Sequence, residues 1–421
     1  MSALPETGRR TGVAARLGVP ALRGHGRFIT GNLVDSVGNG MLLPLGLLYF
    51  TDVRGLPVAQ VGMAMTAGQA AALPVTFLAG RLMDRVGPRA VVVAANVVAA
   101  VGFTLFLFAD RPWHVAAVHL VVQAGINMYF TAQRTLITHV TEPGERRAWF
   151  AFTGSLRNVG LAAGAATAAG SLAVFGKGAL SWLIAVDAAT YLLAALCFAT
   201  LRTTPPGPGQ MPPGGPVGRT DHTRRYLLLV AVNLPYVLAQ AALSVLVALY
   251  ATRALGLPAS AASVIFVVNT VIVSGCSTVV TAHLAPKAPA RAVAAGYLVM
   301  AVGMAAFMLP ALPSLAFTAW VALLTAITLF SVAEILLGPA LSELSVSLTP
   351  GAAGGFTQGL YQFSWAIGMV AAPALFTRLL EAGPLLPWGA EAVACLLAMA
   401  AAPALTASDR HRPRHRRRKP R

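Results

Sequence analysis

The chain has 421 residues, of which 57% are apolar and 11% are charged, and its formal net charge is +17 at pH 7. Soluble domains carry about 25% charged residues, so this composition excludes an ordinary water-soluble protein and indicates that a lipid bilayer is the solvent. The basic residues lie mostly in short loops and tails rather than on one face. Nucleic acid is therefore not an expected partner, and the charge indicates membrane topology instead.

Apolar runs recur along the whole chain. A helix needs about 20 predominantly apolar residues to cross a bilayer. The runs predict an all-α membrane protein with twelve transmembrane helices, at residues 28–50, 58–80, 89–109, 113–140, 148–174, 180–201, 226–251, 258–283, 291–310, 314–341, 353–377 and 385–406.

The first run contains an ionisable residue. Asp35 lies about seven residues into the run, roughly 10 Å from its start at 1.5 Å per residue. Asn32, Asp35 and Asn39 are spaced i, i+3 and i+7, so they share one helix face. Because a charge within the bilayer is costly, we expect this face to look into the protein and Asp35 to be functional.

The loop between the second and third runs is the most specific motif. Its spacing, Gly-x-Leu-x-Asp-Arg-x-Gly-x-Arg, resembles the signature loop of the major facilitator superfamily. The resemblance implies a secondary transporter with two six-helix bundles around a central cavity, which works by alternating access. The loop residues that we expect to form a gate are Gly80, Asp84, Arg85, Gly87 and Arg89.

The family resemblance also implies a partner for the loop aspartate. Asp84 would face the N-terminus of the eleventh helix, near Gly354, Gly355 and Phe356, where the helix dipole is positive. Such a contact would hold the cytoplasmic side closed. The alternative is that the loop charges serve only to set the topology.

The fourth run carries a matching polar stripe. Gln123, Asn127, Thr131 and Arg134 are spaced by 4, 4 and 3 residues, so they lie on one face. The resemblance implies that the first and fourth helices both line the central cavity. We therefore predict an ion pair between Asp35 and Arg134, in which the aspartate carries a proton and the arginine tunes its pKa. The alternative is a structural ion pair that never titrates.

The fifth run places Arg157 and Asn158 before Gly160 and Gly164. Glycines four residues apart let helices approach closely, and the run resembles the fifth-helix glycine motif of antiporters in the family, although Ala165 stands where a proline is usual. Arg157 and Asn158 are candidate cavity residues. The arginine either binds an anionic substrate, counters a carboxylate, or extends its side chain to the interface.

Residues 202–225 differ from the rest of the chain. Six prolines alternate with glycines between positions 205 and 216, which is typical of a flexible linker. The linker separates a bundle at 28–201 from a second at 226–406. The sequence of residues 284–293 is a diverged copy of that of residues 82–91, and such internal duplication is typical of secondary transporters.

The second half offers fewer candidates. Glu334 lies deep in the tenth run and is the second candidate proton carrier, and Tyr361 is a candidate for the wall of the cavity. Asp187 and Glu391 are expected near the membrane interface.

Basic residues give the expected topology. With both termini in the cytoplasm, the inner segments hold 24 basic residues and the outer loops hold 5, as the positive-inside rule requires. We expect a multi-pass protein of a bacterial plasma membrane, with basic cytoplasmic tails at 1–27 and 407–421. The second tail would attract anionic lipid.

These observations favour a transporter over an enzyme, and no cofactor or metal is expected, because no nucleophile–base pair, metal cluster or nucleotide loop is present in the sequence. The hypothesis is proton-coupled export of small apolar or amphipathic molecules, such as a drug or secondary metabolite, by a monomer. The alternatives are a nutrient uptake symporter on the same fold and a non-transporting membrane scaffold or receptor.

Overall fold

The computed structural model describes residues 16–42, 46–201, 219–258, 260–311, 319–349 and 354–406. Almost all of these residues are helical, which confirms the predicted fold class. By length and composition, ten helices can cross a membrane, or eleven if the bent pair at 26–53 counts as one span. One of the ten, at 146–199, holds two successive helices of spanning length, so the described chain accommodates the predicted twelve crossings.

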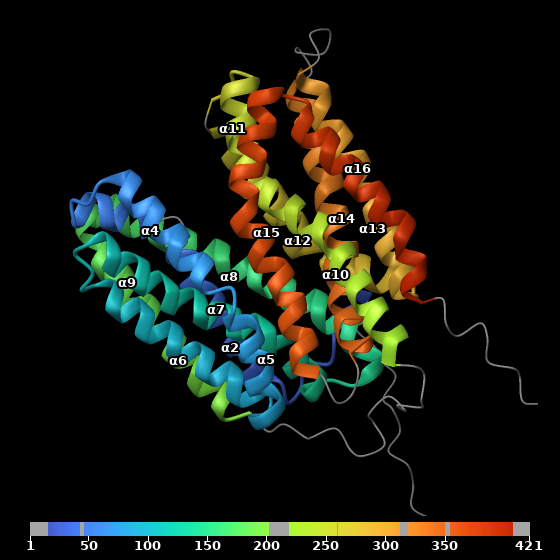
Figure 1. The fold of residues 1–421 in the computed structure, drawn as a ribbon, viewed down its shortest axis with the longest axis horizontal. Helices are drawn as coiled ribbons and strands as arrows, with labels where there is room; N and C mark the ends of the chain where they lie inside the picture. Colours follow the sequence, from blue (N-terminus) through green and yellow to red (C-terminus); the bar gives the residue numbers. More distant parts are fainter. Residues whose placement is uncertain are drawn as a thin grey trace, which may run out of the picture.

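The first half contains the helices up to residue 199 (Figure 1). Helices α4 and α5 together form the second span. The helix is interrupted between them at Pro74, because a proline lacks the N–H that would continue the helical hydrogen bonds. The elements are α2 (Gly26–Leu42), α3 (Gly46–Leu48), η1 (Tyr49–Val53), α4 (Val58–Ala71), α5 (Val75–Val86), α6 (Pro88–Phe106), α7 (Pro112–Val140), η2 (Pro143–Glu145), α8 (Arg146–Phe175), η3 (Gly176–Gly178) and α9 (Ala179–Ala199).

The second half begins with α10. This helix starts at Arg219, so residues 219–225 are helical and the predicted linker ends earlier than 225, because no proline or glycine follows Gly218 there. Residues 202–218 lie outside the described residues, as do 1–15 and 407–421 of the predicted tails. The elements are α10 (Arg219–Ala241), η4 (Ala242–Leu246), α11 (Val247–Leu249), η5 (Tyr250–Ala254), α12 (Ser260–His283), α13 (Pro289–Met308), η6 (Leu309–Ala311), α14 (Ala319–Ser347), α15 (Gly354–Ala382), α16 (Leu386–Ala401) and η8 (Ala402–Leu405).

A second internal repeat links the two halves. Residues 49–57 and 250–258 share the pattern Tyr-x-Thr-x-x-x-Gly-Leu-Pro, and both form π-helical turns that end at a glycine of positive φ, Gly55 at 70° and Gly256 at 63°. The two tyrosines make equivalent contacts. The hydroxyl of Tyr49 donates to the carbonyl of Leu107, and the hydroxyl of Tyr250 donates to the carbonyl of Phe307.

The two halves differ in their cores. In the second half, one continuous apolar cluster runs from α10 to η8. Among the described residues of the first half, the buried apolar side chains form two separate clusters, one around Phe50 and Phe106 and the other around Trp149 and Phe198. Polar side chains of α2 and α7 lie between them, so a buried polar layer interrupts the core of the first half.

The halves contact each other at one end. There α5 packs on α15, α8 packs on α12 and α14, and α7 touches α15. Toward the opposite end the halves diverge, so that α4 and α9 lie far from α11 and α16 (Figure 1). We call the end that carries the loop at residues 80–89 the closed end.

Candidate functional site

The loop at residues 80–89 holds the closed end together. The carboxylate of Asp84 accepts a 2.7 Å hydrogen bond from the backbone N–H of Gly355, at the first turn of α15. This is the contact that the family resemblance implied. Helices α5 and α15 touch backbone to backbone, because a Cβ on Gly80 would meet the carbonyl of Gly355, and a Cβ on Gly355 would meet that of Gly80.

The other loop residues shape the turn and anchor it. Gly87 has a φ of 85°, which a side chain would strain, and it ends α5 and begins α6. Arg89 donates a 2.7 Å hydrogen bond to the carbonyl of Leu201, just after α9, where a cation complements the helix dipole. Arg85 is exposed.

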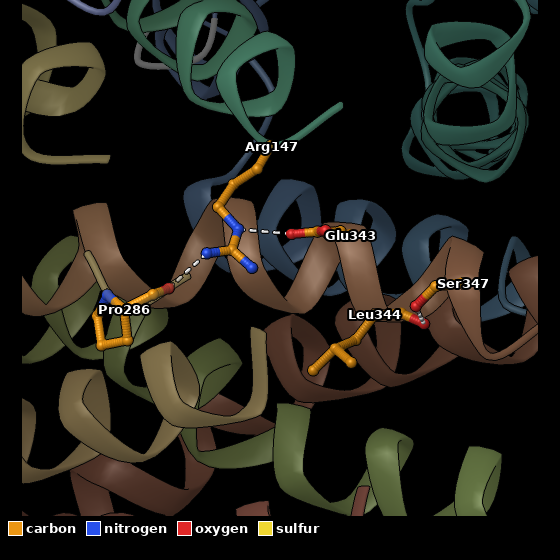
Figure 2. Close-up of polar contacts among 5 residues, drawn as sticks. All are labelled: Arg147, Pro286, Glu343, Leu344 and Ser347. Carbon is orange, nitrogen blue, oxygen red and sulfur yellow. Dashed lines mark hydrogen bonds and ion pairs between the residues drawn. The ribbon is translucent and has the colours of Figure 1, made fainter. Parts of the chain in front are cut away.

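A second contact between the halves lies at the closed end (Figure 2). Arg147, at the start of α8, reaches Glu343, near the end of α14, with 2.5 Å between Nε and Oε2. The same guanidinium donates a 2.7 Å bond to the carbonyl of Pro286 (Figure 2). This pair was not predicted from the sequence, although both residues lie at helix ends that the predicted topology places on the same side.

The chain before α2 also bridges the halves. The His283 ring hydrogen-bonds to the Arg16 carbonyl at 2.8 Å, and Gly18 sits so tightly on α12 that a Cβ there would lie 2.5 Å from Ala282. The His25 ring, farther along, hydrogen-bonds to the carbonyl of Val140 in the first half at 2.7 Å. Residues 16–25 thus form a strap across the closed end.

Asp35 belongs to the polar layer of the first half. It is 5% exposed and lines a small pocket between α2, α6, α7 and α9, together with Asn39, Asn96, Tyr129 and Tyr191. The only side-chain hydrogen bond that its carboxylate receives among the described residues comes from the Asn39 amide, at 3.5 Å. The amide oxygen of Asn96 has no partner in the described chain.

The neighbouring asparagine is part of the same layer. Asn32 accepts hydrogen bonds from the Tyr129 hydroxyl at 2.9 Å and from Gln133 at 2.6 Å. Tyr191 donates to Asn39 at 3.0 Å. The predicted polar face of the first helix therefore looks into the first half, and Asn32 is held in its interior rather than in the space between the halves.

The predicted ion pair between Asp35 and Arg134 is wrong. Arg134 reaches across to the second half, where it donates a 3.2 Å bond to Gln362 and lies 4.6 Å from the centre of the Tyr361 ring. Its third contact is the Phe130 carbonyl. The spacing correctly placed Arg134 on a polar face, but the rotation of α7 turns this residue toward α15 and leaves Tyr129 facing Asp35.

The remaining fourth-helix candidates make contacts within the first half. Asn127 is buried and donates to the carbonyl of Ala72, at the bend between α4 and α5. Gln123 is half-buried beside His119, with 3.3 Å between their nitrogens.

Tyr361, on α15, is buried beneath Arg134, and its hydroxyl donates to Asn233 at 2.8 Å.

Arg157 and Glu334 face the region between the halves. Arg157 is exposed, and its guanidinium lies 4.5 Å from the centre of the Phe130 ring. Glu334 is half-buried and accepts a 3.0 Å bond from Asn269. Asn158, next to the arginine, is half-buried.

Two further carboxylates are buried between helices. Asp187 and Glu391, expected near the interface, are 0% and 4% exposed. Asp187 lies against Gly38 and Thr190, where a Cβ on the glycine would collide with its carboxylate, and Glu391 sits beside Cys395. Neighbouring helices cover both groups, so a position near the end of a helix does not expose them.

The fifth-helix glycines pack two helices of the first half. A Cβ on Gly160 would lie 2.5 Å from Ser36, and one on Gly164 would meet the carbonyl of Val37. Helix α8 therefore lies directly on α2, which carries Asp35. This close approach connects the helix with Arg157 to the helix with the buried carboxylate.

Sequence comparison identifies relatives of the chain. A protein-family model described as Major Facilitator Superfamily matches residues 28–419. The uncharacterized MFS-type transporter YhjO of Bacillus subtilis (strain 168) is 26% identical over 209 residues, which is 49% of this chain and 50% of that protein. Multidrug resistance protein MdtH of Cronobacter sakazakii (strain ATCC BAA-894) is 24% identical over 372 residues, 85% of this chain and 88% of that protein. The match to YhjO thus spans about half of that relative's length.

Solved structures share the fold. The human organic anion transporter MFSD10 (TETRAN) superposes with a TM-score of 0.67 at 15% identity, over 93% of this chain and 100% of that one. The E. coli fucose:proton symporter FucP (N162A) gives a TM-score of 0.71 at 14% identity, over 90% and 98%. At such identities the likeness establishes the arrangement of helices alone.

Proposed function

Because the chain belongs to the Major Facilitator Superfamily and is a secondary active transporter, we propose that it exports small apolar or amphipathic molecules in exchange for protons. Asp35 and Glu334 are the proposed proton carriers. The observation that carries the proposal is that both carboxylates lie within membrane helices, and neither forms an ion pair with any described residue.

The position of these carboxylates supports ion coupling. A carboxylate in the bilayer is expensive unless it serves a function. Asp35 is enclosed by four helices of the first half, and Glu334 sits in the second half beside Asn269 and Tyr236. Each half therefore has a carboxylate that can gain or lose a proton while the halves move relative to each other.

The contacts between the halves support alternating access. The loop with Arg81, Arg85 and Arg89 lies at the closed end, and the positive-inside rule assigns such a loop to the cytoplasm. In this orientation the structure is closed toward the cytoplasm and its halves diverge toward the outside. The Asp84 and Arg147 contacts then have to break when the transporter opens inward.

The direction of transport rests on similarity. The MdtH relative, a protein named for multidrug resistance, aligns over most of this chain. The glycines of α8 resemble those of antiporters in the family. Uptake by symport is the competing function, and the experiment below separates the two.

The proposal is tested with purified full-length protein in liposomes. A pH gradient, acidic or alkaline inside, is imposed with rhodamine 123 outside, and dye accumulation is measured against protein-free liposomes. Exchange with protons predicts accumulation in the acidic lumen, whatever the orientation of the protein. Accumulation in the alkaline lumen would show symport, and no protein-dependent flux under either gradient would overturn the proposed exchange of this dye for protons.

A further inference from the structure

Arg157 of α8 is a cation for which the described residues provide no hydrogen-bond acceptor and no ion pair. It is exposed. The ring of Phe130 lies 4.5 Å away and covers one face of the guanidinium. The edges, which carry up to five N–H donors, are left to meet a planar anionic group such as a carboxylate.

Glu334 is the complementary group on the second half. Its Oε2 is fixed by Asn269 at 3.0 Å. One turn farther along α14, Gly338 lies against the hydroxyl of Tyr236, and the ring of Tyr236 meets Trp365 edge to face at 5.6 Å. A carboxylate beside aromatic rings suits an organic ammonium group, which both attract.

The two groups lie at similar depth. Arg157 is eleven residues after the start of α8, and Glu334 is thirteen residues before the end of α14. At 1.5 Å per residue these positions are about 16 and 20 Å from the closed end, which is near the middle of a hydrocarbon core about 30 Å thick. Helices α8 and α14 pack against each other, so one small molecule can reach both side chains.

We propose that the transported molecules carry one anionic and one cationic group on an apolar body, with Arg157 binding the anionic group and Glu334 binding the cationic group. This inference rests on the proposed function, because it assigns the substrate class of the same site. A substrate with one charge would leave the other side chain unpaired as the site closes, which is costly. A proton and the cationic group compete for Glu334, as exchange requires.

Three dyes with one ring skeleton test the charge assignment. Rhodamine 110 has a free carboxylate and a cationic ring system, rhodamine 123 is its methyl ester, and fluorescein is anionic. Binding to the purified full-length transporter is measured by fluorescence anisotropy. We expect rhodamine 110 to bind about tenfold more tightly than rhodamine 123, since a charge-assisted pair is gained, and fluorescein to bind most weakly.

The variants locate this preference. Arg157→Gln should remove the tenfold preference for rhodamine 110, and Arg157→Lys should restore part of it. Glu334→Gln should remove the discrimination against fluorescein. Arg378→Gln is the matched control, because Arg378 lies near the end of α15 that is opposite to the closed end. This variant should bind the three dyes in the same order of affinity as the wild type. Thermal unfolding checks that each variant is folded.

Two results would overturn the inference. One is equal binding, or no binding, of rhodamine 110 and rhodamine 123 to the wild type. The other is a preference for rhodamine 110 that survives Arg157→Gln. If the inference fails while rhodamine 123 still accumulates against a proton gradient, the proposed function stands and only the substrate class is wrong.

Discussion

The carboxylate of Asp84 accepts its hydrogen bond from Gly355, and so joins α5 of the first half to the first turn of α15 in the second. The first N–H groups of a helix lack partners within the helix and carry partial positive charge. Asp84 can accept from one of these donors only while the two halves touch at the closed end. The free energy of the bond therefore favours this state of the transporter over the one that is open at this end.

Asp84→Asn should open the closed end more often. The amide still accepts a hydrogen bond but carries no charge, so the closed state loses about 0.5 to 1 kcal/mol of helix-dipole interaction. That is roughly a two- to fivefold change in the ratio of closed to open molecules. Distances between spin labels at the starts of α6 and α13 measure this ratio, and an unchanged distribution would contradict the gate.

The control for that experiment is Asp110→Asn. Asp110 lies before α7, and its carboxylate pairs with His114 in the same half at 2.6 Å. Loss of this charge should leave the distance distribution as in the wild type. A similar shift in both variants would mean that net charge, rather than the contact with α15, sets the equilibrium.

Gly355→Ala should prevent closure outright. An alanine Cβ there would overlap the backbone carbonyl of Gly80, and backbone atoms cannot move aside as a flexible side chain can. We expect molecules that remain open at this end and accumulate no dye. The matched control is Gly170→Ala on α8, where nothing lies within 4 Å of the added Cβ, and wild-type transport by a Gly355→Ala variant would show that α5 and α15 need not touch.

The sequence predicted helices and shared faces better than it predicted partners. Spacing placed Asn32, Asp35 and Asn39 on one face, and the structure has them on one face. The partners were wrong because periodicity does not fix how a helix is rotated against its neighbours. Thus Tyr129 rather than Arg134 accompanies Asp35 in the polar layer.

Some of the missed features left a signal in the sequence. The shared pattern at 49–57 and 250–258 marks equivalent turns in the two halves, and it is a clearer repeat than the one at 284–293. Asn96 is a polar residue in the middle of the apolar helix α6, and it lines the pocket of Asp35. The burial of Asp187 and Glu391 left no such signal, because it depends on helices that are distant in the sequence.

Arg147 and Glu343 should show measurable coupling. Their side chains are 13% and 24% exposed, so the pair is partly shielded from water and is expected to contribute about 1 kcal/mol to closure. A double-mutant cycle with Arg147→Ala and Glu343→Ala isolates that energy. The readout is the closed fraction from spin-label distances.

The reversed pair Arg147→Glu with Glu343→Arg gives a second test of this contact. Each single reversal places like charges together and should open the closed end, and the double reversal should recover part of the closure. Full recovery is not expected, because a glutamate cannot donate to the carbonyl of Pro286 as Arg147 does. Additive effects of the two reversals would mean that the pair does not hold the halves.

Asp35→Asn should uncouple transport from protons without unfolding the protein. The amide has nearly the same shape and removes a buried charge, so the fold should be retained. We expect rhodamine 123 accumulation driven by a pH gradient to fall by at least about tenfold, while exchange of internal for external dye continues, because that exchange needs no net proton movement.

Asp187→Asn is the matched comparison for this experiment. Asp187 is more deeply buried than Asp35, at 0% against 5% exposure. It lies against Gly38 and Thr190, however, and does not line the pocket. If proton-driven accumulation survives in the Asp187 variant and is lost in the Asp35 variant, the pocket and not burial alone defines the proton site. Equal loss in both would assign the effect to the polar layer as a whole.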